Sequence, residues 1–453
     1  MNLSALDASQ EYPDRVAVVG DGFALSFAEL AERVTRRLGY LQQLGCSTTN
    51  PRPLALVARL SSATLELLYA AFAAGIPVYP LHPRLPPAAI QQRLDTFDLS
   101  IVDPDCGPSC EPLRDPIPPI EPERPLAVVE TSGSSGEPKH VVLSRSAFVA
   151  AASASAAHLG WQPDDRWLLS LPTAHIGGLS VVTRCLLARR TLVVGSTSDA
   201  HAIATDVARH RVTLLSVVPT VLRRLLRGGW DCPSHVRAIL VGGAPISSES
   251  CTEARSRGWP VLATYGLTET CSQVATQSLR GATRGVGRTL APLEARTVDG
   301  QIEVRGPTLF SGYAVPDAPP DPWGVRYRPA DLVDGWFRTR DRGRIAPDGT
   351  VEVYGRVDDV IISGGENIDP IRVEHALEAL DGVVQAAVFG VPDADWGRVL
   401  AALIVVHPNI DVAEIPVKLG ALLGSHEIPR RLRVVDTLPQ TPAGKLDRAR
   451  LVW

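Results

Sequence analysis

A short segment rich in glycine and hydroxyl groups, residues 131–139, has the composition of a phosphate-binding loop. It reads TSGSSGEPK and lies between two apolar runs, LAVVE and HVVLS, that have the character of β-strands. Such a segment exposes many backbone N–H groups, which bind phosphate oxygens, although the same composition is typical of an ordinary surface turn. Lys139 favours the phosphate interpretation, because the chain has only three lysines, at positions 139, 418 and 445.

This loop does not have the spacing found in P-loop nucleoside triphosphatases. Their motif requires GxxxxGK and then serine or threonine at the start of a helix. Here the lysine comes three residues after the second glycine, follows Pro138 and leads into an apolar run. The segment therefore predicts a nucleotide site of another class.

Composition and charge restrict the class of protein. The 453-residue chain has 45% hydrophobic and 21% charged residues and a formal net charge of −4. It is therefore predicted to be a multidomain globular protein without a basic surface for nucleic acid. We expect no signal peptide and no membrane insertion, because the longest apolar window, residues 65–81, contains Glu66 and two prolines. A cytoplasmic location and seven free, functionless cysteines are expected.

The elements that must position the loop alternate between strand-like and helix-like runs over residues 1–355. This alternation predicts an α/β fold, with a large N-terminal domain of βαβ units whose sheets are mostly parallel. Ligands of such sheets lie beyond the carboxyl ends of the strands. Within this domain, short alternating runs over residues 281–354 predict a small antiparallel β unit.

A second pattern begins after residues 356–358, where the two domains are predicted to join. Residues 359–453 predict a small α+β domain. Its helices are expected over residues 370–380 and 412–423, with strands between and after them. The domain ends in the polar loop PQTPAGKLDR, which carries Lys445.

Seven motifs follow one another along the chain: TSGSSGEPK, PTAHIGG, LVGGAP, YGLTET, TRDRG, YGRVDDVIISGGENI and TPAGKLDR. Together they resemble the adenylate-forming superfamily, which includes acyl-CoA synthetases, firefly luciferases and adenylation domains of nonribosomal peptide synthetases. The resemblance extends from about residue 10 to the C-terminus. The segments SLPTAHIGGLSVVTR and ATYGLTETCSQVAT look most like o-succinylbenzoate–CoA ligases of menaquinone biosynthesis.

The resemblance implies a reaction that uses ATP, Mg²⁺ and coenzyme A. A carboxylate attacks the α-phosphate of ATP to form an acyl-adenylate and diphosphate, and the thiol of coenzyme A then displaces AMP. By resemblance, Lys139 contacts the β- and γ-phosphates, Tyr265 stacks on adenine, and Asp341 and Arg356 bind the ribose. The full set implied to bind ATP is Thr131, Ser132, Gly133, Ser134, Ser135, Gly136, Lys139, Gly242, Gly243, Ala244, Tyr265, Gly266, Asp341 and Arg356.

The same resemblance assigns residues to the two chemical steps. Glu269 would hold Mg²⁺ and Thr268 would meet the α-phosphate. Lys445 would neutralise the oxygens that react in the first step. Asp358 would be the hinge about which the small domain turns between steps. The turn would bring in the segment for thioester formation, Gly364, Gly365 and Glu366.

The acid pocket is implied to lie around the PTAHIGG motif. By resemblance, His175, Gly177 and Gly178 line it, His175 being catalytic, and Arg184 holds the second carboxylate of the substrate. Taken alone, Arg184 is more typical of a buried ion pair. Two further residues depart from the family pattern: Glu137 stands where lysine is common, and His140 where glycine is common. We expect Glu137 to point to solvent, away from the triphosphate.

Three functions remain open on these grounds. The first is a ligase that makes o-succinylbenzoyl-CoA, and the second is a CoA ligase for another aryl or fatty acid. An adenylation module for a carrier protein would use the same first step. The third is a nucleotide-binding protein without turnover, against which Lys139, Glu269 and Lys445 argue. Assembly into a homo-oligomer also remains open.

Overall fold

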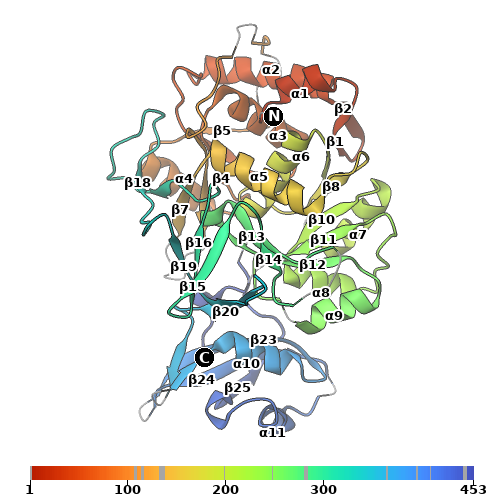
Figure 1. Ribbon diagram of the computed structural model, residues 1–453, viewed down its shortest axis with the longest axis vertical. Helices are drawn as coiled ribbons and strands as arrows, with labels where there is room; N and C mark the ends of the chain where they lie inside the picture. Colours follow the sequence, from red (N-terminus) through yellow and green to blue (C-terminus); the bar gives the residue numbers. More distant parts are fainter. Residues whose placement is uncertain are drawn as a thin grey trace.

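The structure is a computed structural model that describes most of the chain. The described residues are 3–106, 110–113, 117–131, 138–197, 199–246, 248–279, 284–363, 366–393, 396–408, 410–441 and 446–453. In Figure 1 a larger part that contains the N-terminus lies above a smaller C-terminal part drawn in blue. Both parts mix helices and strands, which confirms the predicted α/β class with a large N-terminal and a small C-terminal domain.

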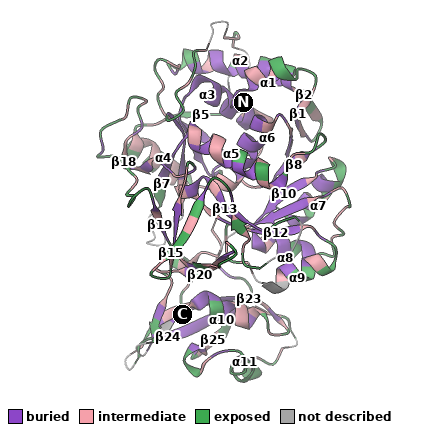
Figure 2. Ribbon diagram, in the orientation of Figure 1, coloured by how far each residue is buried: buried purple, intermediate pink, exposed green. Residues whose placement is uncertain are grey.

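The larger part is built on two extended sheets covered by helices. Its helices are α1 (Ala5–Glu11), α2 (Phe27–Gln43), α3 (Ser62–Ala74), α4 (Pro87–Phe97), α5 (Arg145–Leu159), α6 (Ile176–Ala188), α7 (Ala200–Arg209), α8 (Pro219–Arg227) and α9 (Ser248–Ser256). Every residue of α3 from Thr64 to Ala74 is buried, as expected for a helix that is apolar on all sides. In Figure 2 α3 has the purple colour of buried residues.

A nine-stranded sheet forms one half of the larger part. In spatial order its strands are β14 (Arg288–Thr289), β13 (Ser272–Thr276), β12 (Val261–Leu267), β11 (Ala238–Val241), β10 (Leu214–Val217), β8 (Arg166–Leu169), β9 (Thr191–Val194), β1 (Val16–Gly20) and β2 (Phe23–Ser26). The strands from β12 to β1 pair in parallel, and the strands at either edge are antiparallel. The predicted parallel core is therefore present.

A seven-stranded sheet forms the other half. Its order is β18 (Tyr327–Pro329), β17 (Gly312–Ala314), β7 (Lys139–Ser144), β6 (Pro125–Thr131), β4 (Val78–Leu81), β3 (Leu54–Val57) and β5 (Ser100–Val102). Strands β3 to β6 are parallel, whereas β7 returns antiparallel to β6. The predicted phosphate loop thus connects two adjacent, hydrogen-bonded strands, as its flanking runs indicate.

The small antiparallel β unit predicted over residues 281–354 is present, but it does not include every strand of that range. A separate four-stranded antiparallel sheet does form from β15 (Glu294–Val298), β16 (Gln301–Arg305), β19 (Phe337–Ile345) and β20 (Val351–Arg356). However, β14 joins the nine-stranded sheet, and β17 and β18 join the seven-stranded sheet. An alternating pattern identifies strands but not their partners, because strand pairing depends on contacts distant in sequence.

The C-terminal part has its own hydrophobic core, built around Val373, Leu377 and Ile404. Its elements are β21 (Ile361–Ser363), β22 (Glu366–Ile368), α10 (Pro370–Glu378), β23 (Val383–Asp393), β24 (Gly397–Val406), α11 (Ile415–Leu419) and β25 (Arg431–Val434). The predicted helix over residues 412–423 is too long. A short 3₁₀ turn, Val412–Glu414, precedes α11, which has a proline in its first turn and ends at Leu419, before Gly420.

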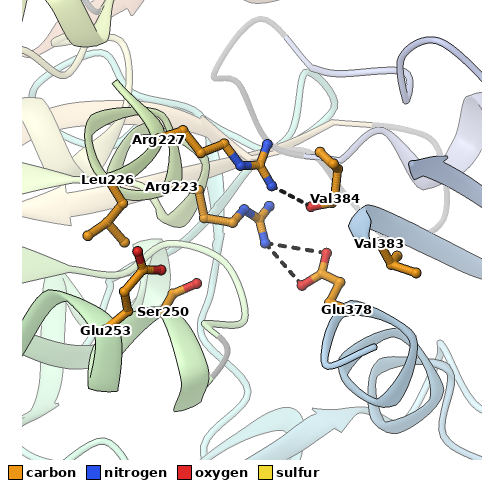
Figure 3. A pocket seen from close by; sticks show the side chains of 8 residues that line it. All are labelled: Arg223, Leu226, Arg227, Ser250, Glu253, Glu378, Val383 and Val384. Carbon is orange, nitrogen blue, oxygen red and sulfur yellow. Dashed lines mark hydrogen bonds and ion pairs between the residues drawn. The ribbon is translucent and has the colours of Figure 1, made fainter. Parts of the chain in front are cut away.

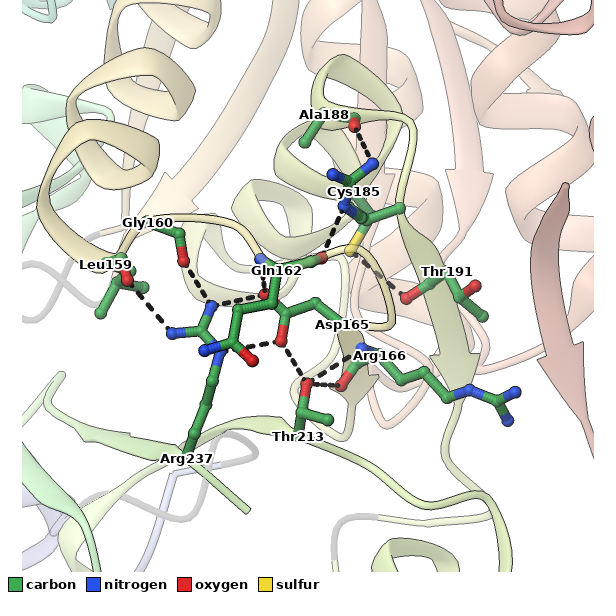
Figure 4. Close-up of polar contacts among 11 residues, drawn as sticks. Leu159, Gly160, Gln162, Asp165, Arg166, Cys185, Ala188, Thr191, Thr213 and Arg237 are labelled. Carbon is green, nitrogen blue, oxygen red and sulfur yellow. Dashed lines mark hydrogen bonds and ion pairs between the residues drawn. The ribbon is translucent and has the colours of Figure 1, made fainter. Parts of the chain in front are cut away.

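A buried carboxylate holds together the amino ends of three adjacent parallel strands. Asp165, Thr213 and Arg237 immediately precede β8, β10 and β11. Oδ1 of Asp165 accepts hydrogen bonds from Thr213 Oγ1 and Arg237 Nε, each at 2.8 Å (Figure 4). Arg237 also donates to the carbonyls of Leu159 and Gly160 at the end of α5. This network therefore holds the amino ends of the strands in place. Ligands of parallel sheets bind at the opposite edge, beyond the carboxyl ends.

Two other expectations concern the whole chain. All seven cysteines are free thiols, as predicted. Among the described residues, no helix combines the length and the apolar character that crossing a bilayer requires.

Candidate nucleotide and acid site

The ends of the predicted phosphate loop are held by the first pair of residues between β6 and β7. Thr131 and Lys139 are partners in register, and Thr131 Oγ1 donates to the Lys139 carbonyl at 3.4 Å. Lys139 therefore begins a strand and is not part of the loop. Its ammonium lies 5.2 Å from the centroid of the Tyr313 ring. Six residues of the prediction lie outside the described residues: Ser132, Gly133, Ser134, Ser135, Gly136 and Glu137.

His140, which stands where the family commonly has glycine, is half-buried. Successive residues of a strand point to opposite faces, so His140 and Lys139 lie on different sides of the sheet. The His140 ring is hydrogen-bonded to the Tyr79 hydroxyl and packs edge-on against Phe97, with ring centroids 4.8 Å apart. Burial lowers the pKa of His140 to about 4. Its imidazole is therefore neutral at pH 7, and its role is to pack between Tyr79 and Phe97.

Glu269 lies in a one-turn 3₁₀ helix, Thr268–Thr270, that follows β12. Its Oε1 accepts a hydrogen bond from Tyr313 Oη at 2.9 Å, and its carbonyl accepts one from the Phe310 amide at 2.9 Å. Within the described part of the chain, Glu269 makes no ion pair. Mg²⁺ in nucleotide sites commonly takes one or two carboxylates, with phosphate and water oxygens completing the shell. A carboxylate with free lone pairs and no cationic partner fits that ion.

A tight turn directly follows this 3₁₀ helix. Cys271 and Ser272 both have left-handed backbone conformations, with φ of 51° and 97°. A Cβ on Gly266 would lie 1.7 Å from the carbonyl oxygen of Ser272, so only glycine fits at this position. The turn thereby sets where Thr268 and Glu269 emerge from β12. The described residues contain no cluster of three or more His, Cys, Asp or Glu side chains able to bind a metal by themselves.

The residues predicted to contact the nucleoside come together from two sheets. Asp341 and Arg356 are partners in register between β19 and β20, and Arg356 Nη1 lies 3.5 Å from Asp341 Oδ1. Oδ2 of Asp341 accepts a hydrogen bond from Tyr265 Oη at 2.7 Å. Burial raises the pKa of Asp341, although the Tyr265 hydrogen bond and the Arg356 charge oppose that shift.

The predicted base-lining segment, Gly242, Gly243 and Ala244, directly follows β11. It lies at the carboxyl end of the parallel sheet, where ligands of this fold class bind. A Cβ on Gly242 would be 2.8 Å from the Thr264 carbonyl oxygen of β12. The segment therefore runs close to the strand that carries Tyr265.

The PTAHIGG motif caps the amino end of α6. His175 is the residue that precedes the helix, with Gly177 and Gly178 in its first turn. A Cβ on Gly178 would lie 2.4 Å from two carbonyl oxygens, those of Leu171 and Pro172. The His175 ring packs against His82, with centroids 5.3 Å apart. His82 directly follows β4 and is buried, and that burial lowers its pKa.

Arg184 is almost completely buried, with 3% of its surface exposed. Its Nη2 donates to Ser272 Oγ at 3.2 Å, and its guanidinium carbon lies 5.4 Å from the centroid of the Trp167 ring. Within the described part of the chain it makes no ion pair, and its Nε has no hydrogen-bond partner. The ion pair considered from the sequence is therefore absent there. Burial lowers the pKa of Arg184 to about 10, so it is still a cation at pH 7.

Sequence reasoning missed three residues of this region: His82, Ser272 and Tyr313. His82 could have been found, because it directly follows a buried strand in YPLHPR and polar residues at carboxyl strand ends are site candidates. Ser272 adjoins the YGLTET motif and links Arg184 to Ser180, its hydroxyl lying 3.4 Å from Ser180 Oγ. Tyr313 carries no local signal, since only the pairing of β17 with β7 brings it to the site.

The predicted hinge and the small part are described only in part. Asp358 forms an ion pair with Arg340 of the larger part. Glu366 begins β22 and is exposed, whereas Gly364, Gly365 and Lys445 lie outside the described residues. The ends of the loop that carries Lys445 meet at a bridge between Gln440 and Leu446.

Two arginines of α8 connect the larger part to the small one. Arg223 Nη1 lies 3.1 Å and 3.3 Å from the two carboxylate oxygens of Glu378, at the end of α10. Arg227 Nη2 donates to the Val384 carbonyl of β23 at 2.8 Å. Figure 3 shows both arginines reaching from α8 across the pocket between the two parts. We call these contacts the α8 clasp.

Family models and curated relatives match most of the chain. The family model described as AMP-binding enzyme matches residues 6–103 and 98–314, and that of the AMP-binding enzyme C-terminal domain matches residues 372–445. The chain is 30% identical to a 2-succinylbenzoate–CoA ligase of Bacillus licheniformis over 97% of both chains. It is 32% identical to one of Listeria monocytogenes, over 97% of this chain and 96% of the relative.

Solved structures of o-succinylbenzoate CoA synthetase from Bacillus subtilis are similar over almost the whole chain. The complex with the acyl-adenylate intermediate has a TM-score of 0.89 at 27% identity, covering 99% of this chain and 98% of that one. The complex with ATP and a magnesium ion has a TM-score of 0.86 at 28% identity, with the same coverage. A double mutant bound to a product analogue has a TM-score of 0.72 at 27% identity, covering 100% and 98%. The chain therefore belongs to the AMP-binding enzyme family.

Proposed function

We propose that the protein is an AMP-forming acid–CoA ligase that converts 2-succinylbenzoate, ATP and CoA into 2-succinylbenzoyl-CoA, AMP and diphosphate. This reaction belongs to menaquinone biosynthesis. Relatives with that name match 97% of this chain. The observation that carries the choice of acid is Arg184, a buried cation without an anionic partner among the described residues, next to the turn that holds Glu269.

The second carboxylate of 2-succinylbenzoate is the anion that Arg184 lacks. A buried guanidinium is costly unless an anion or several acceptors satisfy it. Ser272 is its one hydrogen-bond acceptor in the described structure. When the acid binds, Arg184 receives a charge-assisted contact, and the other carboxylate is directed away from it toward the nucleotide. A monocarboxylic acid such as benzoate leaves the cation uncompensated, which disfavours the second candidate class.

The nucleotide is held by residues from three sheets and from the 3₁₀ turn that follows β12. Asp341 accepts from the ribose hydroxyls with Arg356 beside it, and Tyr265 packs on adenine while its hydroxyl remains on Asp341. Thr131 and Lys139, at the ends of the loop, contact the phosphates. Thr268 meets the α-phosphate. The adjacent Glu269 would hold Mg²⁺, which would neutralise phosphate charge as the carboxylate approaches.

The small domain supplies the remaining charge and changes place between the two steps. Lys445 neutralises the oxygens that meet in adenylate formation. Asp358 is the hinge residue, after which Gly364, Gly365 and Glu366 serve thioester formation. The TM-scores of 0.89 and 0.72, obtained at equal identity, support the inference that the orientation here is nearer to the adenylate-bound form of the relative than to its product-analogue form.

The direct test is to incubate the purified protein with ATP, Mg²⁺, CoA and a panel of acids. The panel contains 2-succinylbenzoate, benzoate, anthranilate and a fatty acid, and mass spectrometry identifies any thioester. We expect 2-succinylbenzoyl-CoA to dominate and labelled diphosphate to exchange into ATP only when that acid is present. A preferred monocarboxylic acid would move the protein to the second candidate, and no exchange with any acid would favour a nucleotide-binding protein without turnover.

The partners are thus small molecules: the acid, ATP and CoA. We place the enzyme in the cytoplasm because ATP and CoA are drawn from there. Assembly of the chain into a homo-oligomer stays a prediction from the sequence.

A further inference from the structure

Tyr313 contacts both of the side chains that are proposed to handle phosphate charge. It lies on β17, which pairs with β7 so that Tyr313 is the partner of Val141 in register. Its hydroxyl donates to Oε1 of Glu269 at 2.9 Å. Its ring lies beneath the Lys139 ammonium, 5.2 Å from the centroid. One side chain therefore connects two charged groups from segments that are far apart in sequence.

The position of Tyr313 is set by packing within the protein. Its ring makes an edge-on contact with Phe310, with centroids 4.9 Å apart, and Phe310 is 3% exposed. The Phe310 amide donates to the Glu269 carbonyl at 2.9 Å, and the Ser311 amide donates to the Val142 carbonyl of β7 at 2.8 Å. The segment thus binds to the Glu269 turn and to β7 before any ligand arrives.

Each contact of Tyr313 leaves its partner able to act. An ionised carboxylate has about four acceptor sites, so one hydrogen bond from Tyr313 leaves Glu269 able to bind a cation. A cation above an aromatic face within about 6 Å of the centroid is attracted to it, yet its three N–H donors stay available. A tyrosine hydroxyl carries its proton at neutral pH, so Tyr313 can donate the hydrogen bond to the carboxylate.

We propose that Tyr313 is a positioning residue for adenylate formation, in which its hydroxyl orients Glu269 for the metal and its ring confines Lys139 for the phosphates. This inference rests on the proposed function, because it assigns Tyr313 to the first of the two steps. Lys139 is exposed, and a lysine side chain with a flexible four-carbon stem can adopt many rotamers. The Glu269 carboxylate can likewise rotate about its side-chain bonds. Holding both in advance lowers the entropy lost when Mg²⁺ and ATP bind together.

Two substitutions separate the two contacts. Tyr313→Phe keeps the ring over Lys139 and removes only the hydrogen bond to Glu269. Tyr313→Leu removes both. The matched control is Tyr327→Phe: Tyr327 lies on the adjacent strand β18 as the partner of Ala314, and its hydroxyl makes no hydrogen bond within the described part of the chain. Circular dichroism checks that all variants are folded.

The first measurement is ATP binding by calorimetry without acid or CoA, in excess Mg²⁺ and in a chelator. In the chelator, Tyr313→Phe should bind ATP as tightly as the parent does. In excess Mg²⁺, its affinity for ATP should be about 10-fold lower than that of the parent. Tyr313→Leu should lose a further factor of about 3 in both conditions, because Lys139 is no longer confined. Tyr327→Phe should match the parent throughout.

The second measurement separates the half-reactions. Both Tyr313 variants should slow diphosphate exchange and leave thioester formation from a supplied acyl-adenylate unchanged. The proposal is overturned if Mg²⁺ raises the ATP affinity of Tyr313→Phe and of the parent by the same factor. It is also overturned if Tyr327→Phe shows the same reduced effect of Mg²⁺ as Tyr313→Phe. If the parent shows no acid-dependent exchange, the proposed function fails, while the calorimetric comparison still decides the role of Tyr313 in binding Mg²⁺ and ATP.

Discussion

Tyr265 and Asp341, on β12 and β19, are joined by a hydrogen bond of 2.7 Å from the tyrosine hydroxyl to Oδ2 of the carboxylate. Only 8% of Asp341 is exposed. The residue proposed to face adenine and the residue proposed to bind the ribose are thus held to each other by the protein. Since the carboxylate has further acceptor sites, this bond orients Asp341 and leaves capacity for the ribose hydroxyls.

The raised pKa of Asp341 predicts a pH dependence of stability. The unfolded carboxyl ionises near its ordinary value of 3.8, whereas the folded one keeps its proton to a higher pH. Between these two pH values the folded state binds more protons, so the free energy of unfolding decreases as pH rises through that window. Asp341→Asn removes this contribution, so its free energy of unfolding should decrease less than that of the parent over the same window. Asp321, Asp369 and Glu374, whose pKa values are also raised by burial, still contribute in both proteins. Urea denaturation at steps from about pH 4 to about pH 7, without nucleotide, measures it.

The control for this prediction is Asp299→Asn, an exposed acid in the turn between β15 and β16. It should follow the parent profile and bind ATP normally. Asp341→Asn should weaken ATP binding by about 10-fold or more, because a neutral amide is a poorer acceptor for ribose hydroxyls. Parallel pH profiles of the parent and Asp341→Asn would contradict the raised pKa.

Arg184→Ala should raise the concentration of 2-succinylbenzoate required for half-maximal rate by at least about 10-fold, since one charge-assisted contact is lost. ATP binding should hardly change. Arg184→Met should leave the free energy of unfolding equal or higher, because it removes a buried charge that no anion in the described structure compensates.

Arg189 provides the matched control, since it is equally buried but is paired with Glu11. Arg189→Met removes hydrogen bonds to Glu11 and to the Leu186 carbonyl, so it should lower stability by roughly 1 to 3 kcal/mol and leave the requirement for the acid unchanged. Steady-state kinetics and denaturation of the four proteins test both statements. An Arg184→Ala enzyme that uses 2-succinylbenzoate as well as the parent does would disprove the substrate role.

Removing the α8 clasp should affect the two half-reactions differently. Arg223→Met breaks the contact with Glu378, so the orientation seen here becomes less populated. A partly exposed ion pair contributes about 0.2 to 1 kcal/mol, so adenylate formation should slow by roughly 1.5- to 5-fold. Thioester formation should stay the same or become faster. Arg344→Met, which breaks an ion pair with Glu352 inside the four-stranded sheet, is the control. Equal slowing of both half-reactions would show that the clasp does not select an orientation.

Lys445→Ala should slow adenylate formation severely and spare thioester formation from a supplied acyl-adenylate, because the lysine acts in one domain orientation only. Lys418→Ala is the control, since Lys418 pairs with Glu414 on the surface of the small domain. Diphosphate exchange and single-turnover thioester formation separate the steps. Equal loss in both would remove Lys445 from its proposed role. Asp358→Pro, which fixes the backbone at the hinge, should hinder the half-reaction that needs the disfavoured orientation.

Local chemistry in the sequence was sufficient to predict the classes of element and the motifs. Alternating apolar runs predicted the parallel sheets, and the glycine-rich segment between two strands predicted a loop that connects β6 and β7. Such features depend on residues within one or two elements, so they can be read without knowing the fold. The scarcity of lysine likewise directed attention to Lys139 and Lys445 from composition alone.

Pairings between distant segments were decided only by the tertiary structure. Residues 281–354 were expected to form one β unit, yet their strands are distributed over three sheets. That distribution brings Tyr313 beside Lys139 and Glu269, and the turn before β13 brings Ser272 to Arg184. Strand order and the burial of a charge are set by the free energy of packing the whole core, to which every segment contributes. The sequence alone thus determined which residue types were available for the chemistry, and the packing of the folded chain decided which of them meet.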